Sequence, residues 1–217
     1  MSIKLTAFKW VPPFAQGLVR DLRVRWALEE AGLSYTEHLI GQEEQSSKEY
    51  REKQPFGQVP VYEEDGLVLF ETGAILLHIA ERSEALMPGD ANGRARARAW
   101  VFAALNSVEP PVQNLVVIDL FCANEEWAKL RRPGVVDFMN NRLKSLSTWM
   151  EGREYLEESF SAGDLMMVTV LRLLRHTDIL SKQHPLLEAH RLRCEARPAF
   201  KKALAAQMAP FARNAPP

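Results

Sequence analysis

Cysteine is scarce in this sequence, and so is net charge. Only two cysteines occur among 217 residues, Cys122 and Cys194, and their wide separation excludes a disulfide framework and a CxxC redox motif. His190 and Cys194 would share a helix face, but no second pair of ligands joins them, so we expect no metal site. The formal net charge is −1. Arginine runs at residues 20–25 and 94–98 lack interleaved aromatic residues, which indicates solvated helix faces and argues against a nucleic-acid partner.

Long apolar runs are also missing. The most apolar internal run, Leu115 to Ile118, stops at Asp119, and Met1 to Leu5 contain no apolar core of the length that a secretion signal needs. We therefore expect no membrane partner and a cytoplasmic location. The composition, 47% hydrophobic and 25% charged, is that of an ordinary globular protein, and the length allows one large domain or two small ones.

The first part of the chain alternates strand and helix signals. Turn chemistry at Asp65-Gly66 separates two short apolar runs, and Gly32 follows a helical pattern where a C-terminal cap is expected. The order strand, helix, strand, helix, strand, strand, helix predicts a small mixed α/β sheet of thioredoxin-like arrangement, whose first two strands are parallel. The predicted strands are 4–8, 35–40, 59–62 and 67–70, and the predicted helices are 18–32, 47–54 and 72–81.

Residues 84–93, which contain Pro88-Gly89-Asp90, have the composition of a linker, and no strand pattern follows them. We expect a helix from 94 to 121 that breaks near Pro110-Pro111, and another helix that opens at Pro133. Ser161 and Asp164 have the spacing of a capping box at the start of an apolar helix. The sequence thus predicts an all-α second domain over residues 94–217, ending in helices that begin at Pro185 and Pro198.

A proline-containing motif stands before the third strand. Pro60 lies in a short apolar run, and a proline there marks a strand start or a sheet edge because it has no N–H to donate. If the Val59-Pro60 bond is cis, Val59 can offer its N–H and C=O to an extended peptide. The sequence leaves the isomer open. Glu71 and Thr72 stand where the next helix begins, and a helix N-terminus can bind a carboxylate.

Taken together, these residues resemble the glutathione transferase superfamily over roughly residues 4–205. The resemblance implies a thioredoxin-like glutathione-binding domain at 1–83, an all-helical domain at 94–217, glutathione as cosubstrate and a homodimer. It implies that Val59 and Pro60 face the cysteinyl backbone of glutathione, while Glu71 and Thr72 face its γ-glutamyl end. Thr72 departs from the serine usual there but keeps the hydroxyl. Lys53 and Gln58 are candidates to contact the glycyl carboxylate or the backbone, and Gln42 and Gln45 are weaker ones.

The residue that usually activates the thiol is missing. Attack by glutathione needs a thiolate, and a free thiol is mostly protonated at neutral pH. The family supplies a tyrosine at the end of the first strand, where this chain has Phe8 or Trp10, or a serine or cysteine at the first helix. Depending on the alignment, the latter position falls on Pro12, Gly17 or Leu18.

Two kinds of group could replace it. Backbone N–H groups at the start of the first helix are one, and the side chains of Gln16 and Arg20 are the other. Trp10 and Phe14 could form an apolar wall for the electrophile, with Phe102 and Leu105 from the helical domain.

The resemblance implies that the protein conjugates the thiol of reduced glutathione to a hydrophobic electrophile. Glutathione-dependent reduction of peroxides or disulfides is the second enzymatic possibility. A non-catalytic interaction module is the alternative from another class.

Overall fold

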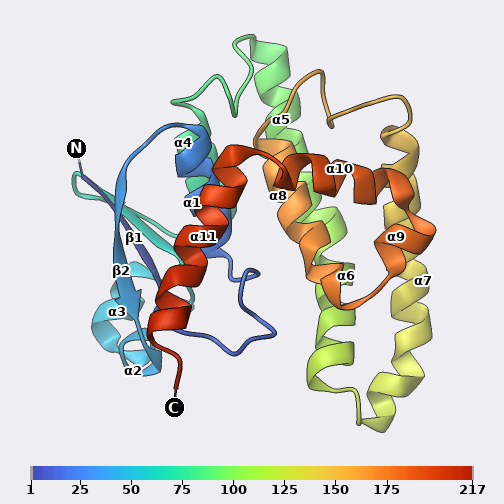
Figure 1. Cartoon of the computed structure of the whole chain (residues 1–217), viewed down its shortest axis with the longest axis horizontal. Coiled ribbons are helices and arrows are strands. Elements are labelled where there is room, and N and C mark those ends of the chain that lie inside the picture. The colour runs from blue at the N-terminus through green and yellow to red at the C-terminus, as the bar shows by residue number, and fades with distance from the viewer. Residues whose placement is uncertain (1, 217) are drawn as a thin grey trace. The chain divides into compact units, whose positions relative to one another are not determined.

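The computed structural model describes residues 2–216, which form two compact units. The first unit combines the residues up to Leu86 with those from Arg197 onward, and the second comprises Met87–Ala196. The last helix therefore belongs to the first unit, whereas the sequence assigned all of residues 94–217 to one helical domain. Figure 1 shows that helix, α11, beside α1, with which it is in contact.

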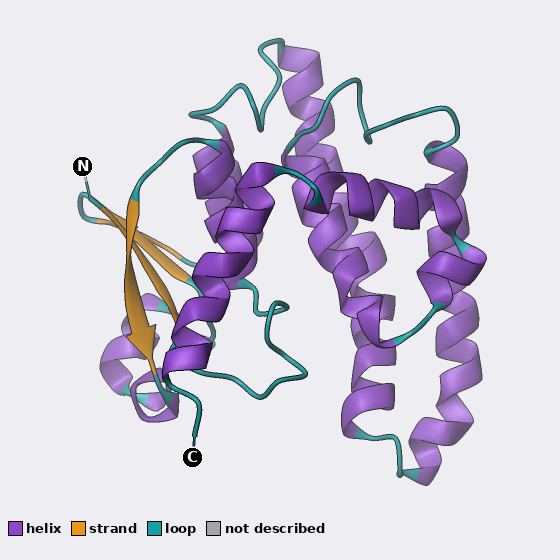
Figure 2. Cartoon of the chain, viewed as in Figure 1, coloured by secondary structure: helices purple, strands orange, loops and turns teal. Residues whose placement is uncertain are grey.

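The first unit contains the predicted mixed sheet. Its strand order is β2-β1-β3-β4, with β1 and β2 parallel and the other pairs antiparallel. Asp65 (φ +47°) and Gly66 (φ +89°) make the two-residue turn between β3 and β4, as their turn chemistry predicts. Figure 2 shows the strands gathered in this one sheet. The strands are β1 (Ile3–Phe8), β2 (Tyr35–Ile40), β3 (Val61–Glu64) and β4 (Leu67–Leu69).

Among the described residues, five helices complete the first unit. The first helix ends at Glu30, and Gly32 follows its C-cap with a φ of +66°. The N–H of Leu33 donates to the carbonyl of Leu28 at 2.9 Å, which closes the helix as the glycine predicts. Trp26 of this helix packs edge-on against Phe200, with ring centroids 4.9 Å apart. This contact fastens the C-terminal helix to the unit. The helices are α1 (Asp21–Glu30), α2 (Gln42–Ser46), α3 (Lys48–Lys53), α4 (Thr72–Ala80) and α11 (Pro198–Arg213).

The second unit is helical, as predicted, and residues 87–196 contain no strand. Its central helix α8 is buried along its whole length and begins with the predicted capping box, in which Asp164 Oδ2 accepts from the Ser161 N–H at 2.9 Å. The α-helices are α5 (Ala91–Ala103), α6 (Glu109–Val116), α7 (Glu126–Trp149), α8 (Ala162–Leu171), α9 (Ile179–Gln183) and α10 (Pro185–Glu195). The π-helical turns η1 (Ala104–Val108) and η2 (Val117–Phe121) and the 3-10 turn η3 (Arg172–His176) join them.

Two differences from the predicted helices concern prolines. Pro133 does not open a helix but lies inside α7, which begins at Glu126. Helix α7 continues through the proline. Ala128 and Met139, on either side of it, are fully buried, and the free energy of this burial offsets the lost backbone hydrogen bond. Pro110 lies in the first turn of α6, after a π-helical turn, so the expected break is a change of helix type. Across residues 2–216, each helix is too short or too polar to span a membrane.

Candidate functional site

The segment before β3 leaves backbone groups outside the sheet. The Val59-Pro60 peptide bond is cis. The ladder between β1 and β3 ends at the pair Thr6↔Val61, so Val59 lies two residues beyond it. The Val59 side chain is buried in a small cluster with Ile40, Tyr50 and Val61. Val59 is therefore anchored by its side chain, while its backbone lies beyond the strand pairing.

Tyr50 and Gln45 hold the turn that leads to Val59. The Tyr50 hydroxyl donates to the Gln58 carbonyl at 2.6 Å, and Gln45 Nε2 donates to the Gly57 carbonyl at 2.7 Å. Burial raises the pKa of Tyr50, so its hydroxyl stays protonated as a donor at neutral pH. The Gln58 side chain itself is exposed beside Val59. Gln45, a weaker candidate from the sequence, thus positions the motif from α2.

Glu71 adopts an unusual backbone conformation at the start of α4. Its φ of +69° and ψ of 114° lie in a region that residues with a side chain rarely occupy, at a cost of roughly 1–3 kcal/mol. Its carbonyl accepts from the Ile75 N–H at 3.0 Å, and its side chain is exposed. Such strain concentrates at ligand sites. The conformation leaves an exposed carboxylate beside the first N–H groups of a nine-residue helix.

Thr72 is buried next to Glu71 and contacts an arginine of α1. Nη1 of Arg23 donates to Thr72 Oγ1 at 3.2 Å, and both side chains are at least 95% buried. A hydroxyl that accepts from a guanidinium still has its own hydrogen to donate. Arg23 therefore orients the Thr72 hydroxyl toward an acceptor and adds positive charge behind it.

Lys53, the last residue of α3, forms an ion pair with the sheet. Its Nζ is 2.9 Å from Glu63 Oε1, and Nζ of Lys4 is 3.0 Å from the other oxygen. Burial opposes ionisation of Glu63, but hydrogen bonds from Lys53 and Lys4 hold the pKa of that carboxyl below its usual value. In this arrangement Lys53 is engaged with Glu63 of β3, which lies four residues along the chain from Val59.

The loop after β1 holds the two catalytic candidates of the sequence. Nε2 of Gln16 donates to the Val11 carbonyl at 3.0 Å, so this amide ties the loop to itself. Arg20 is exposed directly before α1, and Gly17 has a φ of +76°. Gln16 is thus a loop anchor in the structure, while Arg20 carries its charge at the start of the helix.

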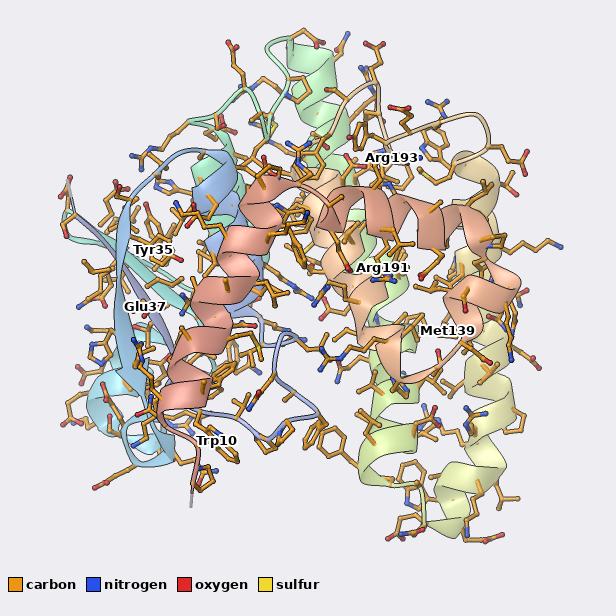
Figure 3. The ribbon with its side chains drawn as sticks, viewed as in Figure 1. Trp10, Tyr35, Glu37, Met139, Arg191 and Arg193 are labelled. Atoms are coloured by element: carbon orange, nitrogen blue, oxygen red, sulfur yellow. The ribbon has the colours of Figure 1, made fainter. Side chains whose placement is uncertain are left out.

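Aromatic side chains of the same loop are partly exposed. Trp10 is half-buried, and Figure 3 shows it beyond β1 in the first unit. Phe14 is 48% exposed. In the second unit, Phe102 is exposed on α5 and Leu105 is half-buried on η1. Each therefore has apolar surface available within its own unit.

Two arginines of α1 contradict the expectation of a solvated face. Arg23 and Arg25 are at most 3% exposed. Nε of Arg25 lies 2.7 Å from Asp21 Oδ2, and its Nη1 pairs with Glu37 of β2. Nε2 of Gln207 donates to Asp21 from α11 at 2.7 Å. The sequence signal that could have revealed this network is the Asp21–Arg25 pair, one helical turn apart.

The sequence of this chain is similar to those of known proteins. The family model described as "Glutathione S-transferase, N-terminal domain" matches residues 6–81, which include Val59, Pro60, Glu71 and Thr72. Glutathione S-transferase 4 of Zea mays is 31% identical over 205 residues, covering 89% of this chain and 90% of that protein. The chain belongs to the glutathione S-transferase family. A probable maleylacetoacetate isomerase 2 of Drosophila melanogaster is 28% identical over 162 residues, 74% of this chain and 70% of that protein.

Solved structures of this transferase family have the same fold. A glutathione transferase from Burkholderia graminis, with two glutathione molecules bound per subunit, superposes with a TM-score of 0.81 at 26% identity, covering 94% of this chain and 88% of that one. A glutathione transferase from Pseudomonas putida has a TM-score of 0.81 at 23% identity, covering 94% and 90%, which shows the fold alone. The expected fold class and family are therefore confirmed.

Proposed function

We propose that this protein is a glutathione transferase that joins the sulfur of reduced glutathione to a hydrophobic electrophile. The observation that carries the proposal is the strained, exposed Glu71 followed by the Thr72 hydroxyl, which Arg23 orients at the start of α4. A carboxylate beside free helix N–H groups suits a ligand that bears both an ammonium and a carboxylate, as the γ-glutamyl end of glutathione does. The bound glutathione of the Burkholderia graminis relative supports this choice of ligand.

Each end of glutathione then has a counterpart in the first unit. Glu71 takes the γ-glutamyl ammonium, while the Thr72 hydroxyl and the α4 N–H groups take the neighbouring carboxylate. The backbone of Val59, beyond the β1–β3 ladder and next to Pro60, pairs with the cysteinyl residue as one strand pairs with another. Gln58 is the candidate for the glycyl end because its side chain is exposed there. Lys53 would first have to leave Glu63.

Thiol activation is assigned to the loop before α1. The cation of Arg20 and the N–H groups at the helix start favour a thiolate over a thiol, because both place positive charge near a sulfur bound there. Gln16 contributes by holding the loop at Val11. Trp10 and Phe14 offer apolar surface to the electrophile, and Phe102 and Leu105 remain candidates from the sequence. This arrangement predicts slow activation of the thiol, because no hydroxyl group of this chain takes the place of the one that donates directly to the sulfur in the family.

Reduction of peroxides or disulfides by two glutathione molecules is the second candidate reaction. The relative from Burkholderia graminis, which holds two glutathione molecules per subunit, favours it. The same thiolate would serve both reactions, and the protein needs no cysteine of its own. Turnover of cumene hydroperoxide against turnover of 1-chloro-2,4-dinitrobenzene separates the two.

We also propose a cytoplasmic homodimer. Phe56 is 64% exposed and stacks edge-on with the partly exposed Phe70 at a centroid distance of 6.2 Å, so the first unit displays an aromatic pair suited to a second copy. Sedimentation velocity of the wild type and of Phe56→Ala tests this. A monomeric wild type would refute the homodimer.

The deciding experiment is a calorimetric titration with reduced glutathione. Saturable binding in the millimolar range or tighter supports the transferase and justifies both substrate screens. A folded sample that releases no heat up to several millimolar refutes glutathione as cosubstrate and favours the non-catalytic module. Oxidised and S-methylated glutathione serve as controls, because they keep the γ-glutamyl end and remove the free thiol.

A further inference from the structure

In the second unit, hydrogen bonds connect a serine, a histidine and an asparagine. Ser147 lies in the last turns of α7, and its Oγ is 3.3 Å from Nδ1 of His184. Nε2 of the same ring is 3.2 Å from Oδ1 of Asn140, also on α7. His184 stands between α9 and α10, so the three side chains join α7 to the corner where these helices meet.

The hydrogen bonds of the asparagine favour one tautomer of the histidine. Nδ2 of Asn140 donates to Gln183 Oε1 at 3.0 Å, so its Oδ1 is the acceptor for His184. His184 therefore carries its hydrogen on Nε2 and presents a lone pair on Nδ1 to the hydroxyl of Ser147. Burial lowers the pKa of His184, so the ring is neutral at pH 7. A neutral base that accepts from a serine hydroxyl is the arrangement that activates a nucleophile.

A cavity adjoins this pair. It has a volume of about 480 Å³, and Ser147, His184, Lys144 and Leu186 are among the residues that line it. The N–H of Leu186 is in the first turn of α10, where backbone donors have no partner within the helix. Lys144 precedes Ser147 by about one turn on α7. Both residues line the cavity, so the Leu186 N–H and the Lys144 ammonium are the candidates to stabilise an oxygen that becomes negative.

We propose that Ser147, His184 and Asn140 form a second catalytic site, which hydrolyses small esters without glutathione. Ser147 Oγ attacks the ester carbonyl carbon while its proton passes to His184 Nδ1. The bond to the alcohol oxygen then breaks, and the alcohol leaves with that proton. A water attacks the acyl-serine and gives a proton to Nδ1, the bond to Oγ breaks, and the proton returns to Ser147. One ester and one water thus give one acid and one alcohol.

Asn140 acts as a positioning residue. It holds the ring and its tautomer, but it is neutral and cannot balance the charge of the protonated imidazole as a carboxylate does. Asn140→Asp should therefore raise the pKa of His184, so the rise of the hydrolysis rate with pH should move to higher pH. A purely structural link would show no such shift.

The test uses the full chain with a fluorophosphonate probe and with 4-nitrophenyl acetate, both without glutathione. We expect a covalent adduct on Ser147, located by tandem mass spectrometry. Ser147→Ala should lose the adduct and reduce hydrolysis about 100-fold. Ser145→Ala is the matched control, because that hydroxyl bonds to the Asn141 carbonyl of its own helix at 3.1 Å, and it should keep both activities.

Two results would overturn the proposal. One is an adduct on another residue, and the other is labelling of the native protein no stronger than that of the heat-denatured protein. In either case Ser147 and His184 only tie α7 to the α9–α10 corner. The location of the adduct in the wild type decides the matter even if Ser147→Ala does not fold.

Discussion

Glu71 should lower the free energy of unfolding and strengthen glutathione binding, and two substitutions separate these two effects. Glu71→Gly removes the side chain that disfavours a φ of +69°, which relieves roughly 1–3 kcal/mol of strain. Glycine costs about 1 kcal/mol through the greater freedom of the unfolded chain. The free energy of unfolding should therefore rise by about 0 to 2 kcal/mol. Glu71→Gln keeps the strain and removes only the charge, so its stability should stay close to that of the wild type.

Both variants should lose affinity for glutathione. A hydrogen bond to a charged group contributes about 1.5–3 kcal/mol, and the loss of that contact raises Kd about 10- to 150-fold. For a protein of this size, 1 kcal/mol shifts Tm by roughly 2–4 °C, so thermal unfolding resolves the stability gain. The assay is calorimetric titration combined with thermal unfolding of wild type, Glu71→Gln and Glu71→Gly.

The two measurements refute different steps. If Glu71→Gln binds glutathione as tightly as the wild type, Glu71 does not contact the ligand. If Glu71→Gly melts below the wild type, the strain at this position is smaller than the entropy cost of glycine. Glu81→Gln is a suitable control, because it removes a carboxylate at the other end of α4.

Three further predictions concern other residues. Thr72→Val should weaken glutathione binding and, by leaving Arg23 with one donor unmatched, reduce the free energy of unfolding by about 1–3 kcal/mol, whereas Thr72→Ser should restore binding. Arg20→Ala should raise the pKa of the bound thiol, and a pH–rate profile that does not move would leave activation to the backbone N–H groups. Burial lowers the pKa of His190 to about 4, so the stability that its neutral ring contributes is complete above about pH 6.5 and is lost as the pH falls toward 4. Relative to His190→Gln, the free energy of unfolding of the wild type, measured by chemical denaturation, should fall by about 2 kcal/mol between pH 6.5 and pH 5. Burial raises the pKa of Asp164, whose Oδ1 lies 3.5 Å from His190 Nε2, to about 6, and this acts in the opposite direction.

The sequence predicted those features whose cause is local. Asp65-Gly66 and Gly32 each mark a backbone conformation with positive φ, and the structure has the turn and the helix end at these positions. The capping box of Ser161 and Asp164 is equally local, since both residues belong to one helix start. The Val59-Pro60 motif and Glu71-Thr72 were found for the same reason, as short patterns with a family resemblance.

Long-range packing decided what the sequence could not. Arg23 and Arg25 look like part of a charged surface, yet they are buried because Thr72 of α4 and Glu37 of β2 reach them from elsewhere in the chain. Pro133 reads as a helix start, but the buried contacts on either side of it outweigh one lost hydrogen bond. Such outcomes depend on which surfaces meet, and a sequence pattern does not specify the partner.

By itself, the amino-acid sequence determined the order of strands and helices, the turn and cap positions, and the motif that points to glutathione, because each is encoded within a few neighbouring residues. Only the tertiary structure placed α11 with the first unit, set Arg23 behind Thr72, and brought His184 to Ser147 and Asn140. These contacts join residues far apart in the chain. Their energy comes from burial and from hydrogen bonds that form only once the helices have packed.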